Sequence, residues 1–272
     1  MCGIVGIYHK KEPACGDVYD ALIQVQHRGQ DAAGISTWDT EKISTHKYTG
    51  LVTEVFKHQK TFDKLAGNIG IGHVRYPTAG GDNVSEAQPF FTANPVNISL
   101  AHNGTLTNRE KLQEELIKIN FCQFNTHSDS EVLLKQFCYE LYKTNFRKLT
   151  KTHVYKALNN VFQKCSGGYA VVMIVAGIGL VAFRDPKGIR PLSLGKYKNS
   201  YLIASESSAI TAMGYDLESD IKPGQVVIID EQGNVDKKRP IKGSTNQPCL
   251  FEYVYFSRPD STIDEISVHK SR

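Results

Sequence analysis

The chain has 272 residues, which is enough for one large domain or two average ones. Charged residues make up 22% of it and hydrophobic residues 40%, a composition that excludes a disordered or fibrous protein. The net charge is +4 and the basic residues are spread along the chain, so nucleic acid is not an expected partner. No apolar run approaches the roughly 18 residues of a membrane span, so a membrane is not expected either.

In chain order, the apolar pattern predicts more strands than helices. Strands are expected at residues 4–8, 34–38, 43–48, 69–75, 96–102, 169–175, 178–184, 201–204 and 225–230. Helices are expected at 17–26, 107–119, 128–142 and 152–164, and Ser128 with Glu131 has the spacing of a capping box. Ala176-Gly177 indicates an antiparallel hairpin between its flanking strands. We therefore expect an α+β fold in which two antiparallel sheets stack face to face with helices outside.

The character of the chain changes near residue 244. An aromatic run at residues 251–256 is followed by a polar tail. We expect this run to be a strand that leaves the first domain.

The beginning of the chain, Met1-Cys2-Gly3, is its sharpest local feature. Methionine is normally removed when the next side chain is small, which would leave Cys2 with both a thiol and a free α-amine. That amine, with a pKa near 7.7–8.0, can take the thiol proton at neutral pH and make the sulfur nucleophilic. The ordinary alternative is a small buried residue at a chain start.

The six cysteines include no CxxC pair and lie far apart in the sequence. This spacing favours reduced thiols and a cytoplasmic protein over a disulfide-linked secreted one.

Three polar, glycine-containing strings interrupt the apolar pattern at residues 26–31, 72–78 and 101–104. Sites are commonly built from such loops on a rigid sheet. Asn103-Gly104 could present a side-chain amide and a backbone N–H to one ligand, with a plain turn as the alternative. For Arg28 and Arg75 the ordinary alternative is a surface ion pair.

Two other kinds of site, a dinucleotide site and a metal site, have weaker support in the sequence. The glycines of Gly70-Ile71-Gly72 are spaced as in a dinucleotide fingerprint, but a helix start does not follow them. A metal hydrolase could use ligands from the set His73, His102, His127, Asp31 and Asp129, but their spacing is not that of a zinc site. We therefore expect no metal site.

Five segments, in this order, resemble the class II glutamine amidotransferases, which are N-terminal-nucleophile hydrolases: residues 2–7, 26–34, 72–80, 102–105 and 127–131. Segments 183–186, 188–192 and 252–261 resemble the amidophosphoribosyltransferases within that class. The resemblance implies a four-layer αββα sandwich. It also implies a class II glutamine amidotransferase domain at residues 2–243. Residues 244–272 would then begin the connection to a phosphoribosyltransferase domain, whose acidic binding loop does not occur in this sequence.

The resemblance also implies a role for each matching residue. Cys2 would attack the side-chain amide of glutamine and release ammonia, while Asn103 and Gly104 would stabilise the oxyanion. The substrate-binding residues that it implies are Arg28, Arg75, Thr78 and Asp129. Among these, Arg75 would bind the α-carboxylate and Asp129 the α-ammonium group, and Arg28 would hold the N-terminal loop.

The implied product, ammonia, would serve phosphoribosylamine formation in the first step of de novo purine biosynthesis. The expected partners are L-glutamine, a phosphoribosyltransferase domain in cis or in trans, and, for the full-length protein, further copies of itself. No cofactor is expected in this chain, because Mg²⁺ would belong with the other domain. Cys249 lies near a position where some relatives hold an iron–sulfur cluster, but thiolate ligands are too few here. The alternatives are a noncatalytic regulatory or assembly module with this fold, or the glutaminase part of another class II amidotransferase.

Overall fold

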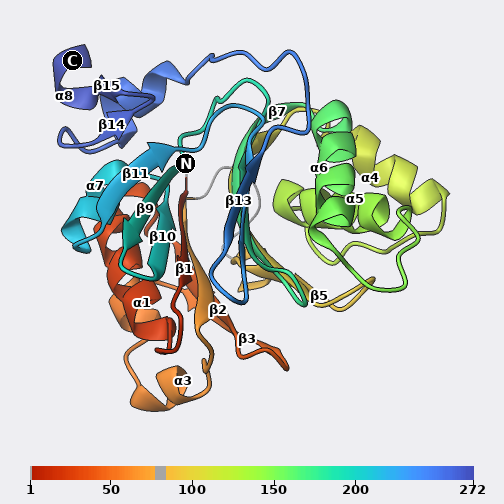
Figure 1. Ribbon diagram of the computed structural model, residues 1–272, viewed down its shortest axis with the longest axis horizontal. Helices are drawn as coiled ribbons and strands as arrows, with labels where there is room; N and C mark the ends of the chain where they lie inside the picture. Colours follow the sequence, from red (N-terminus) through yellow and green to blue (C-terminus); the bar gives the residue numbers. More distant parts are fainter. Residues whose placement is uncertain (1, 77–83) are drawn as a thin grey trace.

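Two antiparallel sheets pack face to face in the computed structural model, which describes residues 2–76 and 84–272 (Figure 1). In spatial order the first sheet contains β11 (Asp216–Asp220), β9 (Ser193–Tyr197), β10 (Ser200–Ala204), β1 (Gly3–Tyr8), β4 (Ile69–Arg75), β2 (Ala32–Trp38) and β3 (Ile43–Thr49). The second contains β13 (Val235–Lys238), β12 (Val226–Asp230), β8 (Gly179–Arg184), β7 (Gly167–Val175), β6 (Ile98–Leu106) and β5 (Phe90–Thr92). The predicted hairpin is confirmed, because β7 and β8 pair antiparallel across residues 176–178.

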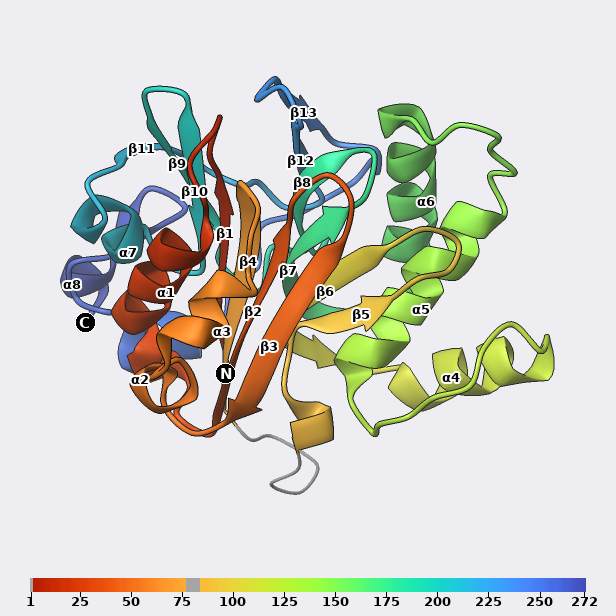
Figure 2. The same ribbon diagram turned by 90° about the horizontal axis from the view of Figure 1, so that it is seen from below.

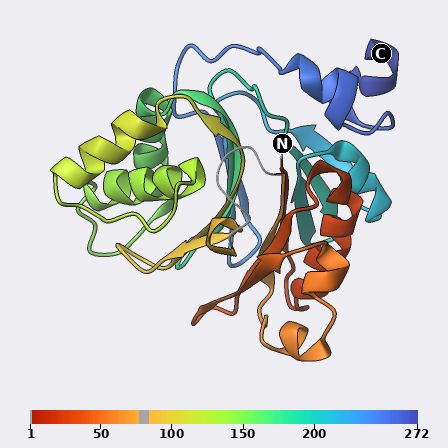
Figure 3. The ribbon, with the colours of Figure 1, turned by 180° about the vertical axis from the view of Figure 1, so that it is seen from behind.

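Helices cover the outer face of each sheet, which confirms the expected four-layer αββα arrangement (Figures 1 and 3). The first sheet is covered by α1 (Cys15–Gln24), α2 (Val52–Val55) and α7 (Ser207–Ala212), and α3 (Gln59–Asp63) follows α2. The second sheet is covered by α4 (Arg109–Lys118), α5 (Asp129–Tyr142) and α6 (Lys151–Lys164). Two short 3₁₀ turns, η1 (Gln26–Arg28) and η2 (Val84–Glu86), complete this part of the chain. Seen from below, α1 and α5 lie on opposite sides of the paired sheets (Figure 2).

The buried apolar side chains form one cluster between the sheets and one under each helix layer. Successive residues of β1 serve different layers: Ile4 belongs to the cluster between the sheets, and Val5 to the cluster under α1. A strand covered on both faces is apolar at every position, which is why β1 is a continuous apolar run in the sequence.

The glycines of Gly70-Ile71-Gly72 lie within β4 and let helix α1 rest directly on the strand. A Cβ atom at either glycine would come within 2.8 Å of Val18, and at Gly72 also of Leu22. Close helix–strand packing therefore accounts for the pair without a dinucleotide.

The predicted helix start at Ser128 is confirmed, but the predicted capping box does not form. The Ser128 side chain accepts a hydrogen bond from the N–H of Ser130 (3.2 Å) and so caps α5. The carboxylate of Glu131 instead accepts from the backbone and hydroxyl of Thr126 (2.9 and 2.8 Å). Glu131 therefore stabilises the loop that precedes α5 and does not cap the N-terminus of this helix.

The prediction of a strand at residues 251–256 is wrong. Glu252–Phe256 form a π-helical turn, with the N–H of Ser257 donating to the carbonyl of Glu252 at 3.0 Å. The hairpin β14 (Thr262–Ile263) and β15 (Ile266–Ser267) and the short helix α8 (Val268–Ser271) follow. We call residues 250–272 the C-terminal segment; it lies beside α7 (Figures 1 and 3). Its buried apolar cluster contains only Tyr253, Ile263 and Val268, so buried charges, described below, hold much of it in place.

Among the described residues, no helix is both long and apolar enough to cross a membrane.

Candidate active site

Cys2 lies directly before β1, where the two sheets meet. Its backbone N donates to Oδ1 of Asn103 (3.1 Å), which lies on β6 of the second sheet. Its carbonyl accepts from Nε of Arg28 (3.1 Å). The main chain of Cys2 is therefore held on both sides, and its thiol is free and only half-buried.

A cavity of about 470 Å³ opens beside Cys2, a size suited to a small polar molecule. It brings together four of the residues that the sequence predicts for the site, namely Cys2, Arg75, Gly104 and Asp129. These residues come from the beginning of β1, the end of β4, β6 and the first turn of α5. They are up to 127 residues apart in the chain. The pairing of β1 with β4 brings Cys2 close to Arg75, and the stacking of the two sheets adds Gly104 and Asp129.

The side-chain amide of Asn103 has an unused donor. Asn103 is fully buried and its oxygen accepts from the backbone of Cys2, whereas its Nδ2 has no hydrogen-bond partner among the described residues. A buried N–H without a partner costs about 1–3 kcal/mol, so a position that keeps one calls for an explanation. Asn103 itself does not line the cavity, but Gly104, which follows it, does, so a ligand held at Gly104 would lie close to this amide.

The backbone N–H of Gly104 points to the edge of β6 that is opposite its neighbour β7. Gly104 lies opposite Tyr169 of β7, and both backbone groups of Tyr169 are bonded to Asp185 on the far side (3.2 and 2.8 Å). The pair is therefore a non-hydrogen-bonded one, which turns the N–H of Gly104 away from β7. Two residues on, the N–H of Leu106 points to the same edge and donates to Asp129 (2.8 Å).

Gly104 cannot be replaced by a residue with a side chain without disturbing the site. Its φ is +154°, and a Cβ atom there would come within 2.0 Å of the carbonyl oxygen of Gly168. The same Cβ would lie 2.8 Å from Nε2 of His102. The Asn-Gly pair is thus part of a strand edge and not a plain turn.

Arg75 and Asp129 give the cavity one positive and one negative side. Nη1 of Arg75 is 2.5 Å from Oδ2 of Asp31, and the side chain is nearly buried. Asp129 is the first residue of α5, and one of its carboxylate oxygens accepts from the N–H of Leu106. A small zwitterion could bind with its carboxylate at Arg75 and its ammonium group at Asp129.

Burial raises the pKa of the Cys2 thiol, and the negative charge of Asp129 adds to this, while Arg75 acts in the opposite direction. The thiol is therefore protonated at neutral pH, and it needs a base to become a nucleophile. Burial also lowers the pKa of His102, and it lowers that of His73 to about 3, so both rings are neutral at pH 7. Within residues 2–76 and 84–272, no three His, Cys, Asp or Glu side chains are grouped as metal ligands.

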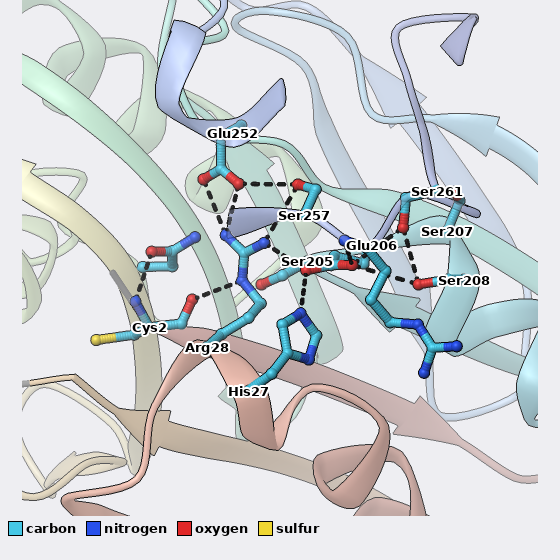
Figure 4. A network of polar contacts seen from close by, with 12 residues as sticks. Cys2, His27, Arg28, Ser205, Glu206, Ser207, Ser208, Glu252, Ser257 and Ser261 are labelled. Carbon is cyan, nitrogen blue, oxygen red and sulfur yellow. Dashed lines mark hydrogen bonds and ion pairs between the residues drawn. The ribbon is translucent and has the colours of Figure 1, made fainter. Parts of the chain in front are cut away.

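Two of the predicted substrate-binding residues are not found in the cavity. Thr78 lies outside the described residues. Arg28 lies behind Cys2, fully buried, and its guanidinium contacts Glu206, Glu252 and the carbonyl of Cys2 (Figure 4). These contacts fit the part of the prediction in which Arg28 holds the N-terminal residues.

Several cavity residues were missed in the sequence. Glu86 accepts from the N–H of His127 (2.9 Å), and Arg109 donates to the carbonyl of the same residue (2.7 Å). Tyr76 follows Arg75, and its ring packs edge-on against Phe256 of the C-terminal segment at 6.0 Å. In the sequence Glu86 and Arg109 are ordinary charged residues that no local pattern marks, whereas Tyr76 lies within the polar string 72–78 but was given no role.

The family model of the glutamine amidotransferase domain matches residues 73–212. The whole chain is 47% identical to the amidophosphoribosyltransferase of Pseudomonas aeruginosa, 46% to that of Escherichia coli and 44% to that of Saccharomyces cerevisiae, and covers 55% of each. A solved structure described as the allosteric regulatory enzyme of purine biosynthesis is similar over 98% of this chain and 55% of its own, with a TM-score of 0.85 and 36% identity. Glutamine phosphoribosylpyrophosphate amidotransferase from B. subtilis, complexed with ADP and GMP, gives the same coverage, a TM-score of 0.84 and 35% identity. The chain thus spans about half the length of these relatives.

Proposed function

Because this chain belongs to the glutamine amidotransferase domain family, we propose that it hydrolyses the side-chain amide of free glutamine, with Cys2 as the nucleophile. The observation that carries the proposal is the hydrogen bond between the backbone of Cys2 and Asn103, whose buried amide N–H has no partner among the described residues. The whole of this chain is similar to about half the length of amidophosphoribosyltransferases, and this similarity supports phosphoribosylamine formation, in the first step of purine biosynthesis, as the use of the ammonia. The six free cysteines favour a cytoplasmic location.

The reaction begins once Met1, which lies outside the described residues, has been removed. The freed α-amine of Cys2 takes the thiol proton, directly or through water, and the sulfur attacks the amide carbon of glutamine. The oxyanion that forms is stabilised by Nδ2 of Asn103 and the N–H of Gly104. The carbon–nitrogen bond breaks, the proton passes to the leaving ammonia, and a thioester remains. Water then attacks the thioester, which gives glutamate and restores the thiol. The groups of the chain suffice for these steps, so we propose no cofactor for this half of the reaction.

Arg75→Ala and Asp129→Ala are expected to raise the KM for glutamine by about 10-fold or more, with kcat changed much less. Each removes a contact that is made equally in the ground state and the transition state. Steady-state measurement of glutamate release separates the two constants. N-acetylglutamine, which lacks the ammonium group, serves as a matched substrate, because Asp129→Ala should lose most of the preference for glutamine over it. A wild-type KM in both variants would contradict the assignment.

We propose that the acceptor of the ammonia, phosphoribosyl diphosphate, binds to a phosphoribosyltransferase domain, in cis or in trans, and not to these 272 residues. The chain alone is therefore expected to hydrolyse glutamine weakly, with the same rate in the presence and absence of phosphoribosyl diphosphate. It should form no phosphoribosylamine even when ammonia is supplied in excess. The measurement is glutamate release with and without that compound, together with product analysis by mass spectrometry. Stimulation, or any phosphoribosylamine, would show that the chain contains an acceptor site.

A further inference from the structure

Behind Cys2, a buried network of charges joins three distant parts of the chain (Figure 4). Arg28 lies in η1, Glu206 directly precedes α7, and Glu252 begins the π-helical turn of the C-terminal segment. All three side chains are at most 1% exposed. Nη1 of Arg28 donates to Glu206 (2.6 Å), and Nη2 donates to both oxygens of Glu252 (2.8 Å each).

The third donor of the same guanidinium, Nε, is the one that holds the carbonyl of Cys2. A guanidinium is a rigid planar fork, so the direction of Nε is set by what the two Nη atoms bind. Glu206 and Glu252 thus determine where Nε points. The backbone of Cys2 is held between this N–H and the side-chain oxygen of Asn103. The amide N–H of the same asparagine is the proposed donor to the oxyanion.

Glu206 and Glu252 belong to different parts of the chain. The second oxygen of Glu206 is held by the N–H of Arg258 (2.9 Å) and the hydroxyl of Ser261 (3.0 Å), and His27 donates to its first oxygen (2.8 Å). Glu252, in contrast, belongs to the C-terminal segment itself. Its carboxylate accepts from Arg28 and from Ser257 (3.1 Å), and Nη1 of Arg190 lies 3.6 Å from one of its oxygens. Its two short bonds to Arg28 connect that segment with the residue that holds Cys2, and the hydroxyl of Ser257 adds a longer contact with Nη1 of Arg28 (3.5 Å).

We propose that Glu252 is a positioning residue for glutamine hydrolysis, which acts through Arg28 to place Cys2 against Asn103; this inference rests on the proposed function. The C-terminal segment is then part of the machinery that prepares the nucleophile. A displacement of about 1 Å in a reacting group can lower a rate about 100-fold, so a small rotation of the guanidinium is enough to matter.

A second buried ion pair provides a matched control. Arg184 binds Asp264 of the same segment through both carboxylate oxygens (2.8 and 3.1 Å), and both side chains are at most 6% exposed. The other bonds of Arg184 go to the carbonyls of Ile221 and Gly188, and none goes to Cys2. Loss of this pair should weaken attachment of the segment without touching the nucleophile.

The test compares Glu252→Gln and Asp264→Asn in the 272-residue chain from which Met1 has been removed. For Glu252→Gln we expect kcat to fall about 10- to 100-fold, with KM changed by less than about 3-fold. The midpoint of the pH profile should stay in place, because Glu252 contacts Arg28 behind the main chain of Cys2 and does not line the cavity. Asp264→Asn should keep kcat and KM within about 3-fold of wild type. Thermal unfolding should show that both variants are less stable than the wild-type chain.

Equal losses of kcat in the two variants would mean that Glu252 only helps to dock the segment, and would overturn the proposal. A normal kcat in Glu252→Gln would overturn it as well. If Glu252→Gln does not fold, Glu252→Asp, which keeps the charge but shortens the reach, must show the lowered kcat with a near-normal KM. If the wild-type chain and Asp264→Asn both release no glutamate, the proposed function itself has failed. If both are active and Glu252→Gln matches them, only the positioning role has failed.

Discussion

Cys2→Ser is expected to fold like the wild-type chain and to release no measurable glutamate from glutamine. A serine hydroxyl has a far higher pKa than a thiol, so an α-amine with a pKa near 8 cannot take its proton effectively. Folding should be retained because, among the described residues, the sulfur makes only one weak hydrogen bond, with the carbonyl of Tyr76 at 3.9 Å. Glutamate release and thermal unfolding measure the two properties separately.

The matched control is Cys249→Ser, which replaces a partly exposed cysteine outside the cavity and should leave hydrolysis unchanged. The intact mass of the active wild-type protein should be one methionine lighter than the encoded chain. Full activity with Met1 retained, or hydrolysis by Cys2→Ser, would show that Cys2 is not an N-terminal nucleophile.

Asn103→Ala is expected to lower kcat about 100-fold or more while KM changes little, because an oxyanion donor acts mainly in the transition state. The alanine variant also loses the oxygen that accepts from the backbone of Cys2. Asn103→Asp separates the two effects, since a carboxylate keeps that acceptor but has no N–H to donate. We expect Asn103→Asp to be at least as slow as Asn103→Ala, because its charge would also repel the oxyanion. A near-normal kcat in the aspartate variant would assign Asn103 to anchoring alone.

The local apolar pattern was enough to find the central elements of the fold. Strands β1, β4, β7 and β8 are covered on both faces, so they are nearly continuous apolar runs, and α5 and α6 have a helical apolar period. Strands β5, β9, β11 and β13 were not predicted. Of these, β5, β11 and β13 lie at sheet edges, whereas β9 is paired on both sides but is short and ends in two exposed residues. An edge strand is defined by its neighbour and not by its own composition.

For residues 251–256 the local pattern was misleading. A short apolar run fits a strand or a helix equally well, and its environment decides between them. Here Glu252 is drawn inward to Arg28 and Tyr253 is buried, while Val254 and Tyr255 face outward, which fits a helical turn and not a strand. Whether residues 244–272 connect to a further domain stays a prediction.

The sequence by itself determined which residue types the site uses, through the resemblance of Cys2, Arg75, Asn103, Gly104 and Asp129 to the matching motifs. The roles of Thr78 and Arg28 in substrate binding stay predictions. Only the tertiary structure showed that Cys2 and Asn103 share a hydrogen bond across the two sheets, and that Glu206 and Glu252 meet at Arg28. Contacts of this kind join residues more than 100 positions apart, and a buried carboxylate has no local signature, because its burial depends on a cation that the fold brings to it.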